Sequence, residues 1–240
     1  MIRAVGLSKR YGSVDALRDF SLDVHPGEIV ALVGPNGAGK TTALKLLVGL
    51  LAPTAGSVSL GGYDVQRNPV EAKRLLAFLP DQPFLYEALT VGECLGFIGG
   101  MYGLAPEVLQ QRANALLQTF GLMERLNDRV GELSYGMKSR LALIMSLLHE
   151  PHAFLLDEPF FGLDPQTLRL VKRLLMECAA RGMAIFLSTH QLPIVEDVAH
   201  RIVILHQGRS LAVGTWEELR RLYGGTRLEE VFFRLTSSGP

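Results

Sequence analysis

A glycine-rich segment at positions 34–41, with the sequence GPNGAGKT, constrains the fold of this chain most strongly. It fits the phosphate-loop pattern, in which glycines at a fixed spacing precede a lysine and a serine or threonine. The apolar run Ile29–Val33 comes before it and predicts a buried strand, and the apolar residues from Thr42 to Leu50 recur at helical spacing. A strand, a glycine loop and a helix in this order bring backbone N–H groups and the positive end of a helix around an anion.

The residues of this loop have separate roles in the pattern. Gly37 and Gly39 let the backbone curl without a clash at Cβ. We expect Lys40 to reach the β- and γ-phosphates of a nucleoside triphosphate, and the Thr41 hydroxyl to bind Mg²⁺. The candidate nucleotide-binding residues of the segment are Gly34, Pro35, Asn36, Gly37, Ala38, Gly39, Lys40, Thr41 and Thr42. The loop by itself does not distinguish a kinase from a GTPase or a motor protein.

Composition limits the class of protein. The chain has 240 residues, 48% of them hydrophobic, which suits one large α/β domain with an inserted subdomain. Its 24 basic and 24 acidic residues balance, so we expect no nucleic-acid partner. Cys94 and Cys178 lie far apart and indicate reduced thiols. No apolar run approaches the length of a membrane span and no signal segment is evident, so we expect a soluble chain that can still dock on a membrane protein.

Short apolar runs predict a largely parallel sheet with both faces covered, because helical patterns separate several of them. These runs are Ile29–Val33, Leu76–Leu79, Ala153–Leu156, Ala184–Leu187 and Ile202–Leu205. Two regions differ from this rhythm. Ser57–Val65 alternates polar and apolar residues around Gly61-Gly62, which predicts a β-hairpin. Residues 90–150 show no strand pattern and predict a helical block set into the α/β core.

Two carboxylates follow one of the predicted strands. Asp157 and Glu158 come directly after Ala153–Leu156, at the strand end where open α/β sheets place ligand chemistry. We expect Asp157 to hold Mg²⁺ through water and Glu158 to polarise an attacking water molecule. Upstream of this strand, Ser134 is a natural helix N-cap and Gly136 permits close backbone approach. Taken alone, that second motif predicts only the start of a helix.

These motifs, taken in order, resemble the nucleotide-binding domain of an ABC (ATP-binding cassette) transporter. The order is a phosphate loop, a Leu-Ser-x-Gly motif, an Asp-Glu-Pro motif after a strand, and a Ser-Thr-His motif after the next strand. The resemblance extends from about Ile2 to Leu222. It implies a phosphate-loop NTPase (RecA-like) α/β core with an antiparallel β subdomain and an inserted helical subdomain. The expected single domain comprises the core with the β subdomain (1–82 and 151–214), the helical subdomain (83–150) and a short C-terminal helical extension (215–240).

The resemblance also implies roles for four further residues. Tyr11 matches the aromatic residue that stacks on adenine. Gln82 matches the glutamine that contacts Mg²⁺ and links the core to the helical block. Asp164, in the run Gly162-Leu163-Asp164, matches a loop that faces the opposite subunit, and His190 matches the histidine that contacts the γ-phosphate.

The family signature Leu-Ser-Gly-Gly-Gln is altered here. Tyr135 replaces its first glycine and Met137 replaces its glutamine, whereas Ser134 and Gly136 remain to hold the γ-phosphate bound by a partner subunit. The change leaves hydrolysis expected and its rate open. Residues 84–93 and 228–235 are similar to the stand-alone ATPases of ABC-2-type exporters.

The sequence therefore predicts an ATP-hydrolysing motor subunit with ATP and Mg²⁺ as ligands. The expected catalytic residues are Lys40, Gln82, Glu158 and His190, and the expected Mg²⁺ contacts are Thr41, Gln82 and Asp157. A second copy or a paralogue would close over two ATP molecules and drive a separate membrane permease. We expect the chain to lie on the cytoplasmic face of the membrane through that permease.

Other functions remain open at this point. A soluble ABC ATPase of DNA repair or translation shares the motifs, but such chains usually carry two cassettes, a coiled-coil insert or a basic arm. The altered signature also leaves open an ATP-gated binding module that does not hydrolyse ATP. A GTPase is disfavoured, because the chain has no Asn-Lys-x-Asp guanine motif.

Overall fold

The structure is a computed structural model that describes residues 1–237. Its centre is a six-stranded sheet with the strand order β10-β9-β3-β8-β7-β6. The pairs from β9 to β6 are parallel, and β10 pairs antiparallel with β9. The strands are β3 (Ile29–Val33), β6 (Leu76–Leu79), β7 (Ala153–Asp157), β8 (Ala184–Thr189), β9 (Arg201–His206) and β10 (Arg209–Gly214). The predicted parallel sheet and its five strands are thus confirmed, and β10 is an addition that the apolar runs did not predict.

Both faces of this sheet are covered, which explains its continuous apolar strands. All residues of β3 are buried. Ile29, Ala31 and Val33 pack into one apolar cluster, whereas Val30 and Leu32 pack into another on the opposite face. The first cluster includes α5 (Tyr135–Leu147), α6 (Pro165–Ala180) and α7 (Leu192–Val198). The second includes α1 (Lys40–Leu47) and a separate antiparallel sheet.

That antiparallel sheet has the strand order β2-β1-β4-β5. Its strands are β1 (Ile2–Tyr11), β2 (Val14–Val24), β4 (Ala55–Leu60) and β5 (Tyr63–Asp64). The predicted hairpin is confirmed, since Leu60 pairs with Tyr63 across Gly61 and Gly62, and both glycines have positive φ. α2 (Pro69–Arg74) follows this sheet and leads back to β6.

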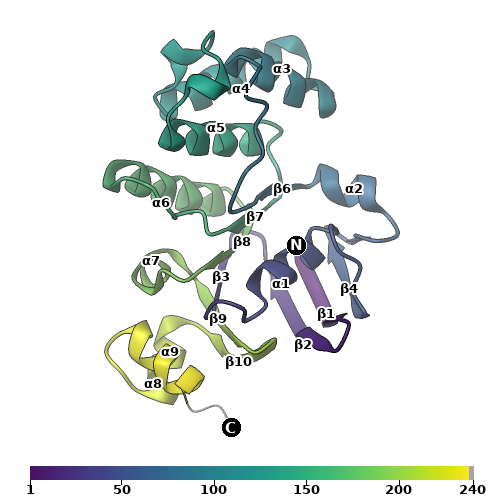
Figure 1. The fold of residues 1–240 in the computed structure, drawn as a ribbon, viewed down its shortest axis with the longest axis vertical. Helices are drawn as coiled ribbons and strands as arrows, with labels where there is room; N and C mark the ends of the chain where they lie inside the picture. The colour runs from purple at the N-terminus through teal and green to yellow at the C-terminus, as the bar shows by residue number, and fades with distance from the viewer. Residues whose placement is uncertain (238–240) are drawn as a thin grey trace.

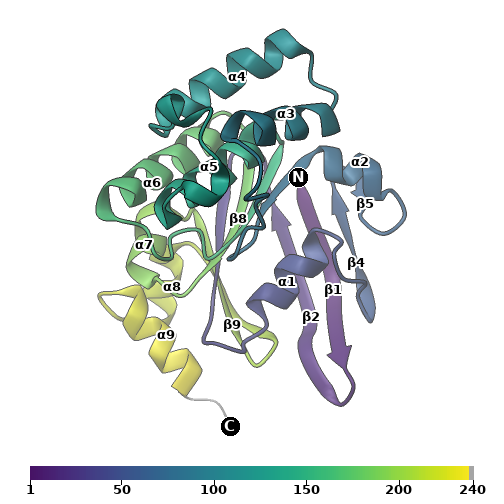
Figure 2. The same cartoon turned by 45° about the horizontal axis from the view of Figure 1, so that its top comes forward.

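The segment between β6 and β7 is helical, as predicted. It contains α3 (Val91–Met101), α4 (Pro106–Thr119), α5 and two short 3₁₀ turns at Met123–Arg125 and Val130–Glu132. Thr90 starts α3 with a capping box, in which its hydroxyl and the Glu93 carboxylate satisfy each other's backbone N–H groups. Figures 1 and 2 show α3 and α4 at one end of the molecule, beyond α5.

The C-terminal segment forms two helices, α8 (Trp216–Tyr223) and α9 (Leu228–Ser237). They lie at the end of the molecule opposite α3 and α4 (Figure 1). The Leu228 N–H donates to the Glu196 carboxylate of α7 at 2.5 Å, which ties α9 to the core. Residues 238–240 of the expected C-terminal extension lie outside the described residues.

Candidate active site

The loop between β3 and α1 has the conformation that its glycines predict. Gly37 and Gly39 have φ values of 77° and 106°, in the region that favours glycine. A Cβ on Gly39 would lie 2.3 Å from the backbone oxygen of Ala16. A Cβ on Gly34 would lie 2.5 Å from the Leu205 carbonyl oxygen. The predicted role of glycine in this curl is confirmed, and the loop is wedged between two neighbouring backbone segments.

A cavity of about 330 Å³ opens over this loop. Its lining residues are Ala16, Asn36, Gly37, Ala38, Gly39, Lys40, Thr41, Thr42, Asp81, Asp157 and Glu158. Among the described residues, no side chain caps the start of α1. Because the first N–H groups of a helix lack partners within it, the uncapped end suits an anion.

Lys40 is the cation of this cavity. Its side chain is 8% exposed, and its ammonium donates to the Gly34 and Pro35 carbonyl oxygens at 2.8 and 3.3 Å. Burial lowers the pKa of Lys40, and the Glu158 and Asp157 carboxylates oppose this shift. The loop therefore holds the ammonium in place before any anion arrives.

Asp157 and Glu158 reach the same cavity from the end of β7. Asp157 is buried and accepts a hydrogen bond from the Ser188 hydroxyl of β8. Glu158 has a φ of 48°, uncommon for a residue with a side chain, and its N–H donates to the Ser188 carbonyl oxygen at 2.9 Å. Both strand ends thus fix the two carboxylates.

His190 lies against Glu158. Its Nδ1 atom is 3.0 Å from the Glu158 Oε1 atom, and its backbone N–H donates to Oε2 at 3.3 Å. Glu158 follows β7 and His190 follows β8, and the two strands are parallel neighbours. The structure therefore brings together Lys40, Asp157, Glu158 and His190, which the sequence predicted from separate motifs.

Asp81 is a cavity residue that the sequence analysis missed. Both Asp81 and Gln82 are exposed, but only Asp81 is among the residues that line the cavity. Burial raises the pKa of Asp81, the Asp157 and Glu158 carboxylates raise it further, and His190 opposes them. A signal for it existed in the sequence, because Asp81 follows the predicted strand Leu76–Leu79 at the same sheet edge as Asp157.

Several predicted residues lie apart from this cavity. Tyr11 is 47% exposed, and the Lys9 ammonium lies 5.3 Å from the centre of its ring. Ser134 caps α5 by accepting a hydrogen bond from the Met137 N–H at 3.4 Å, and Gly136 lies in the first turn of that helix. None of Tyr11, Ser134 and Gly136 is among the residues that line the phosphate-loop cavity.

Asp164 has a local structural role as the N-cap of α6. Its carboxylate accepts from the N–H groups of Gln166 and Thr167 at 2.9 and 3.0 Å, and from the Thr167 hydroxyl at 2.6 Å. The bond from that hydroxyl, followed by those from the backbone, lowers the pKa of Asp164. The start of α6 thus fixes the orientation of this carboxylate.

Comparisons with known proteins agree with this geometry. The family model described as "ABC transporter" matches residues 17–161. The linearmycin resistance ATP-binding protein LnrL of Bacillus subtilis is 34% identical over 239 residues, which span 100% of this chain and 76% of LnrL. The Nod factor export ATP-binding protein I of Burkholderia thailandensis is 39% identical over 208 residues, or 87% of this chain and 68% of that protein.

Solved structures give the same result. The ATP binding subunit of an ABC transporter matches with a TM-score of 0.93 and 38% identity, over 98% of this chain and 99% of that one. A nucleotide-free ATP-binding cassette, 24% identical with a TM-score of 0.82 over 97% of this chain and 98% of that one, shares the fold. Among the described residues, no helix combines the length and the apolar character that crossing a membrane requires. The chain therefore belongs to the ABC transporter family, as one of its ATP-binding, ATP-hydrolysing subunits built on the phosphate-loop NTPase fold.

Proposed function

We propose that this chain is the motor subunit of an exporter and that it hydrolyses ATP to drive a separate membrane permease. The observation that carries the hydrolytic part is the Glu158–His190 pair beside the phosphate loop, with 3.0 Å between the Glu158 Oε1 and His190 Nδ1 atoms. Two relatives are named for Nod factor export and linearmycin resistance, which supports export as the direction of transport.

In this proposal, Lys40, Glu158 and His190 have separate roles in ATP binding and hydrolysis. Lys40 and the uncapped start of α1 hold the phosphates of ATP. Glu158 accepts a proton from the water molecule that attacks the γ-phosphorus. The bond between the γ-phosphorus and the β–γ bridging oxygen breaks, and the products are ADP and inorganic phosphate. His190 orients the Glu158 carboxylate and contacts the γ-phosphate.

The charge of the cavity supports Mg²⁺ as its metal. Asp81, Asp157 and Glu158 face a single ammonium, that of Lys40, so a triphosphate entering alone would meet an excess of negative charge. Among the described residues, no group of three His, Cys, Asp or Glu side chains is arranged to hold a metal by itself. This suits Mg²⁺, which keeps several water ligands and binds through one or two protein groups plus phosphates. Thr41 and Asp157 would hold it, and bound Mg²⁺ would neutralise charge on the phosphates.

Asp81 and Gln82 compete for the remaining metal contact. The resemblance to the family favours Gln82, whereas the lining of the cavity favours Asp81. We assign the contact to Asp81, acting through water, and leave Gln82 as the link to the helical block. Asp81→Asn is then expected to raise the Mg²⁺ concentration needed for tight ATP binding, and Gln82→Ala is expected to leave it unchanged. A fluorescent ATP analogue titrated at several Mg²⁺ concentrations measures both, and the opposite ranking would return the contact to Gln82.

A second nucleotide-binding subunit completes the proposed site. Ser134 and Gly136 lie outside the phosphate-loop cavity of their own chain, so contact with ATP requires the nucleotide of another subunit. Tyr11 would stack on the adenine ring of its own ATP, and the Asp164 loop would face the partner. The partner is a second copy or a paralogue.

The permease would dock on the helical block. A groove of about 330 Å³ runs between the segment after β6 and the helices α3 and α5, with Phe84, Ile98 and Met145 among its lining residues. Phe84 is 80% exposed, and its ring contacts Tyr86, which in turn contacts Phe97. Such an exposed apolar surface fits a short cytoplasmic helix of the permease. The chain would then sit at the cytoplasmic face of the membrane through this contact.

Replacing Glu158 by glutamine tests the hydrolytic assignment. The amide keeps the shape of the side chain but cannot accept the proton, and loss of a general base typically slows a reaction by about 10²- to 10⁴-fold. ATP affinity is expected to persist. Turnover by Glu158→Gln at the wild-type rate would show that the base lies elsewhere.

Tyr86→Asp tests the docking surface separately. We expect it to retain ATP binding and lose both association with the permease and stimulation of the ATPase. Tyr63→Asp is the matched control, because Tyr63 is also exposed but lies on β5, outside the helical block. Equal co-purification of the two variants with the permease would place the dock elsewhere.

A further inference from the structure

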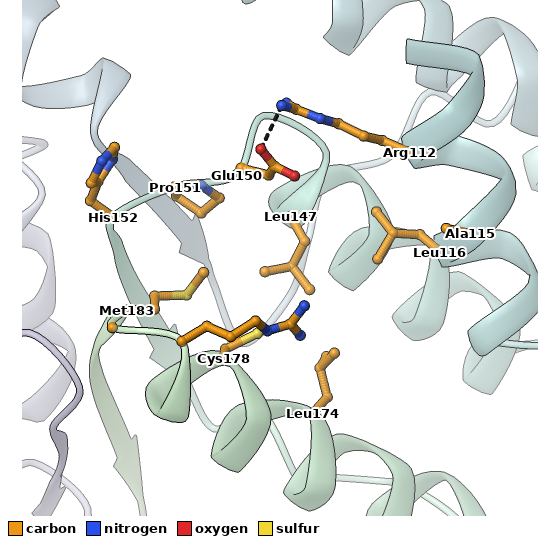
Figure 3. Close-up of a pocket in the computed structure, with 12 residues that line it drawn as sticks. Arg112, Ala115, Leu116, Leu147, Glu150, Pro151, His152, Leu174, Cys178 and Met183 are labelled. Atoms are coloured by element: carbon orange, nitrogen blue, oxygen red, sulfur yellow. Dashed lines mark ion pairs between the residues drawn. The ribbon is translucent and has the colours of Figure 1, made fainter. Parts of the chain in front are cut away.

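A second cavity, of about 450 Å³, lies at the edge of the central sheet opposite the phosphate loop. His152 and Met183, at its wall, directly precede β7 and β8, whereas the ATP site follows the other ends of these strands. The lining residues are Arg112, Ala115, Leu116, Leu147, Glu150, Pro151, His152, Leu174, Cys178, Arg181, Gly182 and Met183. They come from α4, from the end of α5, from α6 and from the segments that lead into β7 and β8 (Figure 3). The cavity therefore joins the helical block to the core and is separate from the ATP site.

The interior of this cavity is apolar. Leu147 of α5 and both Leu174 and Cys178 of α6 are buried, and Leu116 of α4 and Met183 are partly buried beside them. Figure 3 shows the leucine side chains directed into the same space. Ligand sites of small molecules have this character, with mostly apolar walls, a few polar groups and volumes of about 300–1,000 Å³.

One positive charge of the cavity lining, that of the solvent-exposed Arg181, has no carboxylate partner among the described residues. Arg112 forms an ion pair with Glu150 at 2.5 Å across the rim, as the dashed line in Figure 3 marks. Arg181 donates through Nε to the Glu177 carbonyl oxygen at 3.2 Å and interacts with the Cys178 thiol. Within residues 1–237, Arg181 forms no ion pair with a carboxylate. Two arginines and one glutamate thus give the lining a net charge of +1.

We propose that this cavity binds a monoanionic aliphatic amphiphile, a carboxylate with a medium-length hydrocarbon chain. The carboxylate accepts hydrogen bonds from the Arg181 guanidinium, because Arg112 is already matched by Glu150. The chain packs against Leu116, Leu147 and Leu174 and leaves water. An uncharged apolar ligand would gain nothing from the Arg181 guanidinium, which is exposed to water in the free chain, and a nucleotide would place several charges against one cation. The inference does not depend on the proposed exporter function.

Decanoate, kept below its micelle-forming concentration, is the probe for this site. Calorimetric titration of the full chain is expected to give saturable binding of one molecule per chain. Arg181→Gln should weaken binding by about 10-fold or more, since a hydrogen bond to a charged group contributes about 1.5–3 kcal/mol. Arg173→Gln is the matched control, because Arg173 lies on the same helix, pairs with Glu177 and is not part of this lining. Decanol should bind more weakly than decanoate.

The two cysteines give a readout that needs no variant. Cys178 lies in the cavity wall and Cys94 is buried elsewhere, and both are free thiols. Saturating decanoate is expected to slow alkylation of Cys178, followed by peptide mass spectrometry, and to leave the rate at Cys94 unchanged. The proposal is overturned by any of three results: no saturable binding at millimolar decanoate, equal weakening by the two arginine variants, or equal alkylation of Cys178 with and without decanoate.

Discussion

The phosphate loop and the start of α5 carry the two most specific motifs of this chain. The two segments differ in how closely the rest of the structure packs around them. Neighbouring backbone encloses the loop at Gly34 and at Gly39, and the Gly208 N–H donates to the Ala38 carbonyl oxygen at 2.9 Å. At the start of α5, no atom of residues 1–237 outside the immediate helix lies within 4 Å of a Cβ built on Gly136, and the adjacent Tyr135 is 56% exposed.

This difference in packing indicates which candidate site residues one chain brings together and which would need a second subunit to reach ATP. The phosphate loop, the carboxylates after β7 and His190 are brought together within a single chain, and we propose that they bind the phosphates of ATP. At the start of α5, Ser134 caps the helix, but neither Ser134 nor Gly136 is among the residues that line the phosphate-loop cavity of the same chain. Mutations in the first region are therefore expected to change stability and ATP binding, whereas mutations in the second are expected to change chiefly turnover, apart from their effect on the helix cap.

The largest expected effect comes from Gly39→Ala. The φ of 106° alone is expected to cost about 1–3 kcal/mol in a residue with a side chain, and the new Cβ would meet the Ala16 carbonyl oxygen. Thermal unfolding should show a clear loss of stability, and ATP binding should be lost. Gly136→Ala is the matched control, because the site is open and alanine favours a helix over glycine by about 1 kcal/mol. Equal unfolding temperatures for the two variants would contradict the expectation that the phosphate loop is more closely packed than the start of α5.

Lys40→Ala and Ser134→Ala separate binding from turnover. Loss of the buried ammonium should weaken ATP binding by about 10- to 100-fold, as expected for hydrogen bonds to a charged group. Ser134→Ala should leave ATP affinity unchanged at protein concentrations too low for association, and lower turnover where subunits meet. Ser134→Thr keeps the hydroxyl and controls for the lost helix cap. A fall in the ATP affinity of dilute Ser134→Ala would place Ser134 in its own chain's site.

The sequence predicted the central sheet well because of where its strands lie. β3 and β7 are buried on both faces, so they form unbroken apolar runs between turn residues. The long strands β1 and β2 were not predicted from such runs, because exposed residues alternate with buried ones and the register shifts near Gly6, which has positive φ. An interrupted alternation of this kind is hard to separate from a loop.

The candidate site shows a similar limit. Fixed motifs placed Lys40, Asp157, Glu158 and His190 correctly beside one another, since parallel strands end at one edge of the sheet. Between Asp81 and Gln82, the motif resemblance pointed to Gln82. Both residues lie in a bend after β6, and of the two only Asp81 lines the cavity, so the role of Gln82 stays a prediction.

The altered signature gives a smaller expected effect. The aromatic ring of Tyr135 lies 3.0 Å from the position of a Cβ on Gly162, so in this chain it packs toward the loop before α6. We expect Tyr135→Gly to lower turnover much less than Ser134→Ala or Gly136→Asp, because Tyr135 offers no phosphate contact. Steady-state ATPase assays at equal protein concentration rank the three variants. Equal losses in all three would give Tyr135 a role at the interface that its packing does not indicate.

The smallest expected effect concerns Asp164, whose carboxylate both caps α6 and stands in the loop predicted to face the partner. Its pKa is lowered, chiefly by the bond from the Thr167 hydroxyl. A lowered pKa means that the carboxylate stabilises the fold above the pKa of the unfolded chain, and that this contribution is lost as the pH falls through the folded pKa. Asp164→Ala should therefore lower the unfolding temperature at neutral pH, and the difference from wild type should shrink in acid.

Asp164→Ser keeps a capping oxygen without the charge and should restore most of the stability. If Asp164→Ser is as stable as wild type but hydrolyses ATP more slowly, the carboxylate acts across the subunit interface. If the turnover of Asp164→Ser is normal, Asp164 acts only as a helix cap, and the loop before α6 contributes no carboxylate to a site shared between subunits.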